Sequence, residues 1–404
     1  MLESLSIINF PPLYLIAFGF LFVISNLLMR FGHRLGLPLL SILLLLGYLL
    51  GPSFLGIIES PSPLWQSLIS NTVLSLVGLL IGSKLYSIKF DQRALKISMI
   101  VIIGSVVLIT LPLYFLTHNL FLALLIAVLG TFTAPTHTIT IIEETTPVHG
   151  KASFFSDLVL KVVMYGEILI ISLFSILVFY TDSGPLTETP AEKTAFLSPL
   201  KALFSSLALT GLVVSLISVP TIYMCRLMGH DRFKVPEALG IVLLLAGLSL
   251  MLDLSPLLTA IVMGYLITRF TQARTGTLGD IENIEWLIFI PFFILAGTTL
   301  HIQSLLTAGL FGLTFIFARI FARYASGWIA VKAILPSKKG LTGQWLGLTL
   351  LPQGGVVIGA AWVAAGIFPN EKEIIMLSII GSTVFFEIIG PILLRSGLLK
   401  SNTL

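Results

Sequence analysis

Long apolar runs recur along almost the whole chain, and they restrict its fold more than any other feature. Each is about twenty residues long, which is the length of an α-helix that crosses the hydrocarbon core of a bilayer. Only 10% of the 404 residues are charged and 56% are hydrophobic, too apolar a composition for a soluble domain. Helices satisfy their own backbone polar groups inside lipid. The sequence therefore predicts an all-α polytopic membrane protein.

The apolar runs divide into thirteen predicted transmembrane helices, with the weakest division between residues 252 and 255. They span 12–31, 38–58, 69–89, 95–117, 119–143, 153–180, 198–225, 236–252, 255–270, 281–300, 304–333, 343–366 and 372–398.

The basic residues predict the orientation of these helices. If the N-terminus lies outside, only Lys193, Lys201 and Lys372 fall in outside loops, whereas seventeen of the 23 Lys and Arg residues fall inside. Cytoplasmic loops of membrane proteins carry such an excess of basic residues. We therefore expect a multi-pass protein of the cell (inner) membrane with a cytoplasmic C-terminus. The start of the chain lacks the basic segment of a cleavable signal peptide.

Two interruptions of the apolar pattern indicate an internal symmetry. Span 119–143 is broken at TFTAPT (131–136) and span 343–366 at LPQGG (351–355), and the run after each carries a central glutamate. Inverted repeats with Pro- or Gly-broken helices at matching places are typical of secondary transporters. The predicted organisation is an extra helix (1–37), a first five-helix repeat (38–180), an outer loop with linking helices (181–254), an inverted second repeat (255–398) and a cytoplasmic tail (399–404).

Glu167 lies near the middle of the run 153–180, where a charge is costly. A protonated glutamate that bonds a neighbouring helix is one reading, and an ion and proton site is the one we favour. Pro135 cannot donate a hydrogen bond, so the break would free backbone carbonyls, and Thr131, Thr133 and Thr136 would add hydroxyl oxygens. Such oxygens suit a hard monovalent cation, although a proline kink patched by threonines is the alternative.

Arg319 and Arg323 lie four residues apart in the run 304–333 and share one helix face. Arginine stays charged when buried, so a mid-span arginine needs a carboxylate, carbonyls or water. We expect Arg319 to be a fixed countercharge near Glu167. Arg323 lies one turn nearer the cytoplasm, and we expect it to extend its charge to the interface.

Four further residues are weaker site candidates. Gln353 in the second break would support the ion site, and Glu387 would brace the second broken helix. His137 follows the first break and is read either as a packed histidine or as a pH sensor. Lys161 and Asp157 are spaced as a simple helix pair, and Lys161, six residues from Glu167, faces away from it.

Several sequence strings occur in the order that one known family shows. They are LLGYLLGPSFLGII (45–58), TAPTHTITIIEE, PFFILAGTTLHI (291–302), the ARI that contains Arg319, LGLTLLPQGGVVIG (346–359) and FFEIIGP (385–391). Through them the chain resembles the monovalent cation:proton antiporters, the superfamily that includes bacterial sodium/proton exchangers and potassium-efflux systems. The resemblance covers about residues 38 to 398.

The resemblance implies a homodimer with a dimerisation domain and a moving core domain, in which the two broken helices cross at the ion site. The family's key motif falls on Gly166-Glu167. One branch has two aspartates there and the other has Asn-Asp, so this chain keeps one acidic position of the pair. The family's basic residue falls on Arg319.

The expected function is exchange of Na⁺, or alternatively K⁺, for H⁺ by alternating access. One titratable acid predicts one proton per cation and an electroneutral cycle. The alternatives are a gated channel or non-transporting sensor on the same scaffold, and a sodium-coupled organic-anion symporter. We expect no enzyme activity and no cofactor, because His137 and Glu143 lack HExxH spacing and Cys225 is the single cysteine. The expected partners are small cations, protons, membrane lipid and a second copy of the chain, without nucleic acid.

Overall fold

A computed structural model gives the fold, and its regular structure is helical throughout the described part of the chain. It describes residues 19–28, 39–86, 90–146, 153–182, 210–212, 214–220, 222–223, 234–252, 254–271, 277–300, 302–335 and 341–402. Its helices include α2 (Leu39–Leu50), α3 (Pro63–Tyr86), α4 (Gln92–Thr117), α5 (Leu120–Leu129), α6 (Pro135–Thr145), α7 (Phe154–Asp182), α9 (Lys234–Met251), α10 (Pro256–Thr271), α11 (Thr277–Thr298), α12 (Ile302–Ile334), α13 (Leu341–Thr349), α14 (Val356–Ile367), η4 (Pro369–Glu371) and α15 (Lys372–Asn402).

Both predicted interruptions are present as breaks between helices. The first separates α5 from α6, and the second separates α13 from α14. The prediction for span 38–58 was too long, because α2 ends at Leu50 and a turn follows in which Gly56 has a positive φ of 63°. α15 continues to Asn402, past the start of the predicted tail. The predicted loop beyond residue 182, most of span 198–225 and Cys225 lie outside the described residues.

The chain divides into two compact units. The smaller comprises residues 1–61 and 286–300, and the larger comprises 62–285 and 301–404. In the smaller unit, α2 packs closely on the end of α11. A Cβ atom at Gly47 would lie 2.0 Å from the carbonyl oxygen of Ile294, and one at Gly297 would lie 2.2 Å from that of Leu44. Small residues allow this close backbone approach between membrane helices.

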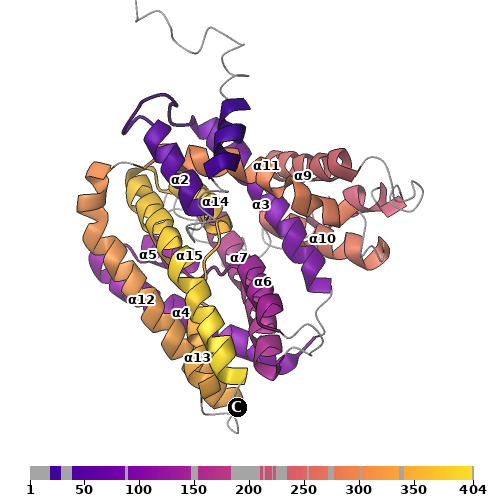
Figure 1. Cartoon of the computed structure of the whole chain (residues 1–404), viewed down its shortest axis with the longest axis vertical. Helices are drawn as coiled ribbons and strands as arrows, with labels where there is room; N and C mark the ends of the chain where they lie inside the picture. The colour runs from indigo at the N-terminus through magenta and orange to yellow at the C-terminus, as the bar shows by residue number, and fades with distance from the viewer. Residues whose placement is uncertain are drawn as a thin grey trace, which may run out of the picture. The chain divides into compact units, whose positions relative to one another are not determined.

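In the larger unit, α3 and α10 form a pair of the same kind and lie side by side (Figure 1). A Cβ atom at Gly264 would lie 2.3 Å from the carbonyl oxygen of Leu79, and one at Gly82 would lie 2.1 Å from that of Ile261. α9 packs against α3 and α10.

The rest of the larger unit surrounds α7, the helix that carries Glu167. α4 packs against α5, α7 and α12, and α15 packs against α6, α12, α13 and α14 (Figure 1). Apolar side chains of α4, α6, α7, α12, α13 and α15 form one continuous core, which includes Val101, Ile142, Val162, Val331, Leu346 and Leu394. This core holds α7 on several sides and fixes where its polar residues can lie.

The exposed surface fits a lipid environment. On α12, Phe317 and Phe321 are 68% and 62% exposed, whereas Arg319 and Arg323 on the other face are buried. Polar residues of membrane helices face the protein interior in this way. By length and composition, α3, α4, α7 and the segment Pro369–Lys400 are suited to cross a membrane, and shorter apolar helices accompany them in the described part of the chain.

We predict that Gly264→Ala destabilises the larger unit, because its methyl group would overlap the backbone of α3. Overpacking of this kind costs about 1–3 kcal/mol. The midpoint of thermal unfolding in detergent should fall, whereas Gly240→Ala, where a Cβ atom meets nothing within 4 Å, should leave it equal or higher. Equal midpoints for the two variants would contradict the close packing of α3 and α10.

Candidate ion site

Glu167 is buried on α7, with 1% of its surface exposed. Both of its hydrogen bonds come from Thr133 in the first helix break. The Thr133 amide donates to Oε2 at 3.1 Å, and the Thr133 hydroxyl donates to the same oxygen at 2.8 Å. Oε1 has no hydrogen-bond partner among the described residues. One carboxylate oxygen is therefore held by the protein, and the other is available.

The first break places Thr133 beside the start of α6. We predicted that Pro135 lies inside the break, but it is the first residue of α6, a position that suits proline because its nitrogen needs no partner there. The positive end of the α6 dipole favours a carboxylate nearby. The Thr131 hydroxyl, which we expected to face the site, instead donates to the carbonyl of Ala127 at 2.7 Å. The Thr136 side chain lies outside the described part of the structure.

Arg319 joins the two breaks. Its Nη2 atom donates to the carbonyl of Phe132 in the first break at 2.9 Å and to the carbonyl of Leu351 in the second at 3.2 Å. The guanidinium also stacks over the Phe386 ring of α15, with 4.3 Å between Cζ and the ring centroid. The side chain is fully buried. A flat, fork-shaped cation suits this combination of carbonyls and an aromatic face.

Arg323 lies one turn further along α12, and our prediction that it reaches the interface was wrong. It is 1% exposed, and its Nη2 atom donates to the carbonyl of Thr131. In an uninterrupted helix that carbonyl would accept from the nitrogen four residues later, which is the nitrogen of Pro135. The arginine takes the place of the hydrogen bond that proline cannot make.

The arginines neutralise the site from a distance. Among the described residues, no ion pair within 4.0 Å connects either guanidinium to Glu167. Each guanidinium donates to backbone oxygens of the breaks through Nη2, whereas Nε of both and Nη1 of Arg319 have no partner among the described residues. The hydrogen bonds of the carboxylate come from Thr133 and not from the arginines. A positive species bound at Oε1 would not replace a hydrogen bond from either arginine.

The second break lies against the first. A Cβ atom at Gly354 would be 3.4 Å from Cβ of Ala134, and one at Gly390 on α15 would be 2.5 Å from Cα of Pro352. Gln353, which lies between Pro352 and Gly354, is fully buried. Neither the oxygen nor the nitrogen of its side-chain amide has a hydrogen-bond partner among the described residues. A buried amide without a partner indicates an unseen water or ion, because such groups are otherwise bonded.

Glu387 and His137 lie on the helices that flank the breaks. Glu387 is buried on α15, three residues before Gly390, and it takes part in a further interaction. His137 is half-buried in the first turn of α6, and its Nδ1 atom has no partner among the described residues. Neither forms a hydrogen bond with Glu167.

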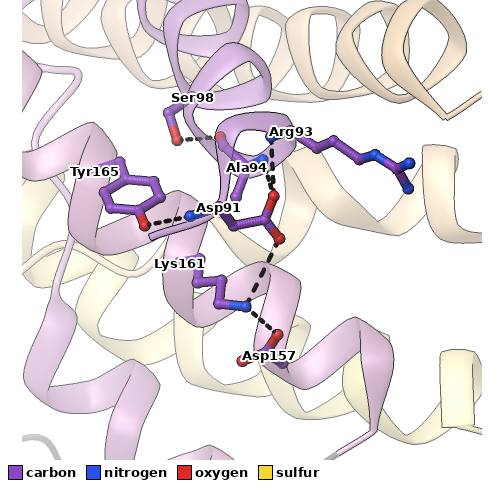
Figure 2. Close-up of polar contacts among 7 residues, drawn as sticks. All are labelled: Asp91, Arg93, Ala94, Ser98, Asp157, Lys161 and Tyr165. Carbon is purple, nitrogen blue, oxygen red and sulfur yellow. Dashed lines mark hydrogen bonds and ion pairs between the residues drawn. The ribbon is translucent and has the colours of Figure 1, made fainter. Parts of the chain in front are cut away.

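Lys161 belongs to a separate cluster, as its spacing predicted (Figure 2). Its ammonium lies 2.6 Å from Asp157 on the same helix and 3.7 Å from Asp91. Asp91 caps α4 by accepting from the amides of Arg93 and Ala94, and its own amide donates to the Tyr165 hydroxyl at 3.0 Å. This cluster ties α7 to the start of α4 and does not contact Glu167.

A small cavity borders Gly166, the residue before Glu167. Its volume is about 10 Å³, and its lining includes Gly166, Ser98, Thr133 and Arg323. That is about the room that one water needs. A Cβ atom at Gly166 would lie 3.5 Å from Cδ1 of Ile102, which is ordinary contact. Packing therefore does not require glycine here, and the position contributes no second acidic group.

Sequence reasoning missed two groups in the site. The Phe132 carbonyl and the Phe386 ring both hold Arg319, and no motif marks either of them. A proline leaves unpaired the oxygen four residues before it, which for Pro135 is the Thr131 carbonyl that binds Arg323. That rule does not mark the Phe132 carbonyl. In the described part of the chain, no group of three or more His, Cys, Asp or Glu side chains could hold a metal ion.

A membrane-embedded carboxylate held at one helix break, beside a second break, is the arrangement of a secondary transporter. The comparison with known families agrees with this class. The chain belongs to the sodium/hydrogen exchanger family, whose transmembrane region matches residues 19–398. The resemblance that the sequence motifs predicted is thereby confirmed.

Solved structures with a similar fold include two of one protein. A structure of the sodium proton antiporter MjNhaP1 from Methanocaldococcus jannaschii at pH 8 matches with a TM-score of 0.70 and 17% identity, over 96% of this chain and 100% of that one. An electron microscopy structure of MjNhaP1 matches with a TM-score of 0.61 and 16% identity, over 97% and 98% of the two chains. At these identities the likeness concerns the fold.

We predict that Arg319→Lys lowers the stability of the protein. An ammonium cannot keep both carbonyl bonds and lie flat on Phe386, and a lost buried bond to a charged group costs about 1–3 kcal/mol. Thermal unfolding in detergent should show a lower midpoint, whereas Arg395→Lys, on an exposed part of α15, should not change it. An unchanged midpoint for Arg319→Lys would show that its contacts to the two breaks contribute no stability.

Proposed function

We propose that the protein exchanges a monovalent cation for a proton, with Glu167 as the site that the two ions share. Its membership of the sodium/hydrogen exchanger family supports cation:proton antiport. Sodium is the expected cation, because MjNhaP1 is also described as a sodium proton antiporter, and potassium is the second candidate. The observation that carries the proposal is the available Oε1 atom of a fully buried carboxylate.

Competition between the two ions follows from the surroundings of Glu167. An ionised carboxylate without a positive partner is costly in a medium of low dielectric constant. A proton on Oε1 neutralises it, and so does a cation bound to the same atom. The Thr133 hydroxyl donates to Oε2 and keeps lone pairs that can bind the cation, and the Gln353 amide oxygen is a supporting ligand. One ion must leave before the other binds.

Alternating access then couples the two ion flows. In the mechanism that the resemblance implies, a core domain moves against a dimerisation domain, and the carboxylate crosses the membrane only when it is neutralised. We propose the same cycle in a homodimer, with the N-terminus outside and the C-terminus cytoplasmic.

The charge balance of the site favours an electroneutral cycle. Among the described residues, Glu167 is the single acidic side chain that hydrogen-bonds Thr133 in the break, and Gly166 supplies no second carrier. Arg319 and Arg323 keep their protons, because arginine does not deprotonate in proteins. One proton is therefore exchanged for one monovalent cation, and the membrane potential does not drive the cycle.

We predict that Glu167→Gln abolishes exchange and leaves a folded protein, because the amide is neutral and cannot be charged by proton loss. The assay uses proteoliposomes with an internal pH dye and a panel of Na⁺, K⁺ and Li⁺ pulses. Glu143→Gln, on an exposed position of α6, is the matched control and should exchange at the wild-type rate. Cation-driven proton movement by folded Glu167→Gln would refute the site. Cation flux without proton movement in the wild type would indicate a channel.

We also predict that wild-type exchange moves no net charge. On a solid-supported membrane, pulses of saturating Na⁺ should give no steady translocation current, whereas the same protein acidifies or alkalinises vesicles in the dye assay. The reason is that each cation replaces one proton on a single carboxylate. A current that persists at symmetric, saturating ion concentrations would show that a second charge carrier takes part.

A further inference from the structure

A large cavity lies at one end of the larger unit and does not belong to the Glu167 site. Its volume is about 900 Å³, and it is bordered by the start of α3, the end of α7, the junction of α9 and α10, and the end of α14. Hydroxyl and amide side chains line much of it, including Ser67, Ser70, Asn71, Ser172, Ser175 and Ser249. We call it the serine-lined cavity.

The lining of the serine-lined cavity is uncharged, and its hydroxyl and amide side chains stand among a larger number of apolar ones. None of its described lining residues is ionisable. The cavity volume of about 900 Å³ is far above the room that one water needs, so the cavity can hold many waters. Ser175 donates to the Ser255 hydroxyl at 2.8 Å, so α7 and α10 are linked along the same wall. A hydrated ion can pass over such groups without being trapped.

Phe174 connects this cavity to the ion site. It lines the cavity and is 5% exposed. It follows Glu167 by seven residues, which is nearly two full helical turns, so both side chains leave the same face of α7 about 10 Å apart along the axis. Ile171, four residues after Glu167 on this face, is fully buried. The path along this face of α7 from the carboxylate to the cavity is therefore lined by the apolar side chains of Ile171 and Phe174.

Phe132, in the first break, packs against Phe174 on this path. Its ring meets that of Phe174 edge to face, with centroids 6.1 Å apart and an angle of 82° between the planes. Phe132 is 1% exposed and directly precedes Thr133, which binds Glu167. Edge-to-face aromatic pairs of this kind add about 0.5–1.5 kcal/mol beyond the burial of their surface.

We propose that the Phe132–Phe174 pair is the gate between the serine-lined cavity and Glu167, and that the cavity is the route by which hydrated cations and protons reach the site from one side. This inference rests on the proposed exchange function and adds its path and its seal. In the predicted orientation, the cavity opens toward the outside. The described structure has this gate closed.

The gate residue Phe132 lies in the same backbone segment that contacts the ion site. The Phe132 carbonyl accepts a hydrogen bond from Arg319, and the next residue, Thr133, donates two hydrogen bonds to Glu167. The gate ring is therefore directly adjacent in the chain to the residue that binds the carboxylate. A cation that binds Oε1 and the Thr133 hydroxyl acts directly on the backbone that carries the Phe132 ring. Release of the aromatic contact can thereby follow a change of load at Glu167.

Cysteine accessibility tests the gate without relying on transport. In a Cys225→Ser background, which removes the single cysteine, Ile171→Cys places a thiol behind the gate and Ser172→Cys places one in the cavity. A membrane-impermeant methanethiosulfonate reagent is added to proteoliposomes. Adding Phe174→Ala should speed labelling of Ile171→Cys about tenfold, because thiol modification follows exposure, and should leave Ser172→Cys unchanged. Phe174→Leu should give an intermediate rate.

A matched control is Phe317→Ala, which removes a ring of equal size from an exposed position on α12 and should not change either rate. Equal labelling of Ile171→Cys with and without Phe174 would overturn the gate. An unreactive Ser172→Cys would overturn the cavity as a water-filled route.

If the labelling pattern holds while Glu167→Gln still exchanges ions, the gate stands and the proposed exchange site fails. If folded Phe174→Ala dissipates a pH gradient without added cation, the leak supports the seal.

Discussion

The cost of placing charge in a medium of low dielectric constant governs this structure. Glu167, Arg319 and Arg323 are each 1% exposed or less, and a bilayer offers no water to solvate them. Their partners come from the two helix breaks, whose backbone groups are not used within a helix. Buried charge and interrupted helix therefore support each other: the carbonyls of the breaks accept hydrogen bonds from Arg319 and Arg323, and these are the hydrogen bonds that the two buried guanidinium groups make among the described residues.

Arg319 makes the two breaks behave as one body. Its guanidinium holds a carbonyl from each, and Phe386 covers its face. A displacement of the first break relative to the second costs Arg319 one of these two hydrogen bonds, in an environment that offers no water to replace it. A transporter that shifts its site across a membrane needs this kind of rigidity, since a loosely held carboxylate could meet both solutions at once.

Local rules predicted the parts of the site that depend on one helix. The central position of Glu167, the breaks, the shared face of the two arginines and the Lys161–Asp157 pair follow from spacing alone. Tertiary packing decided the rest. Hydropathy did not show that α2 ends at Leu50. It also did not show that the first break offers the Thr131 carbonyl to Arg323, which we expected to reach the interface. Phe132 is invisible to motif reasoning because its backbone oxygen, not its side chain, binds the arginine.

The neutral lining of the serine-lined cavity has a consequence for how the protein meets its surroundings. Clefts lined by one sign of charge concentrate counter-ions and respond strongly to ionic strength. The described walls of this cavity carry no ionisable side chain, so they do not enrich cations by long-range attraction. In the proposed exchange mechanism, the cation concentration at the inner end of the cavity then follows that of the adjoining solution, and Glu167 alone selects among the ions. With such a cavity, we expect occupancy of the proposed site to follow the bulk cation concentration without electrostatic enrichment.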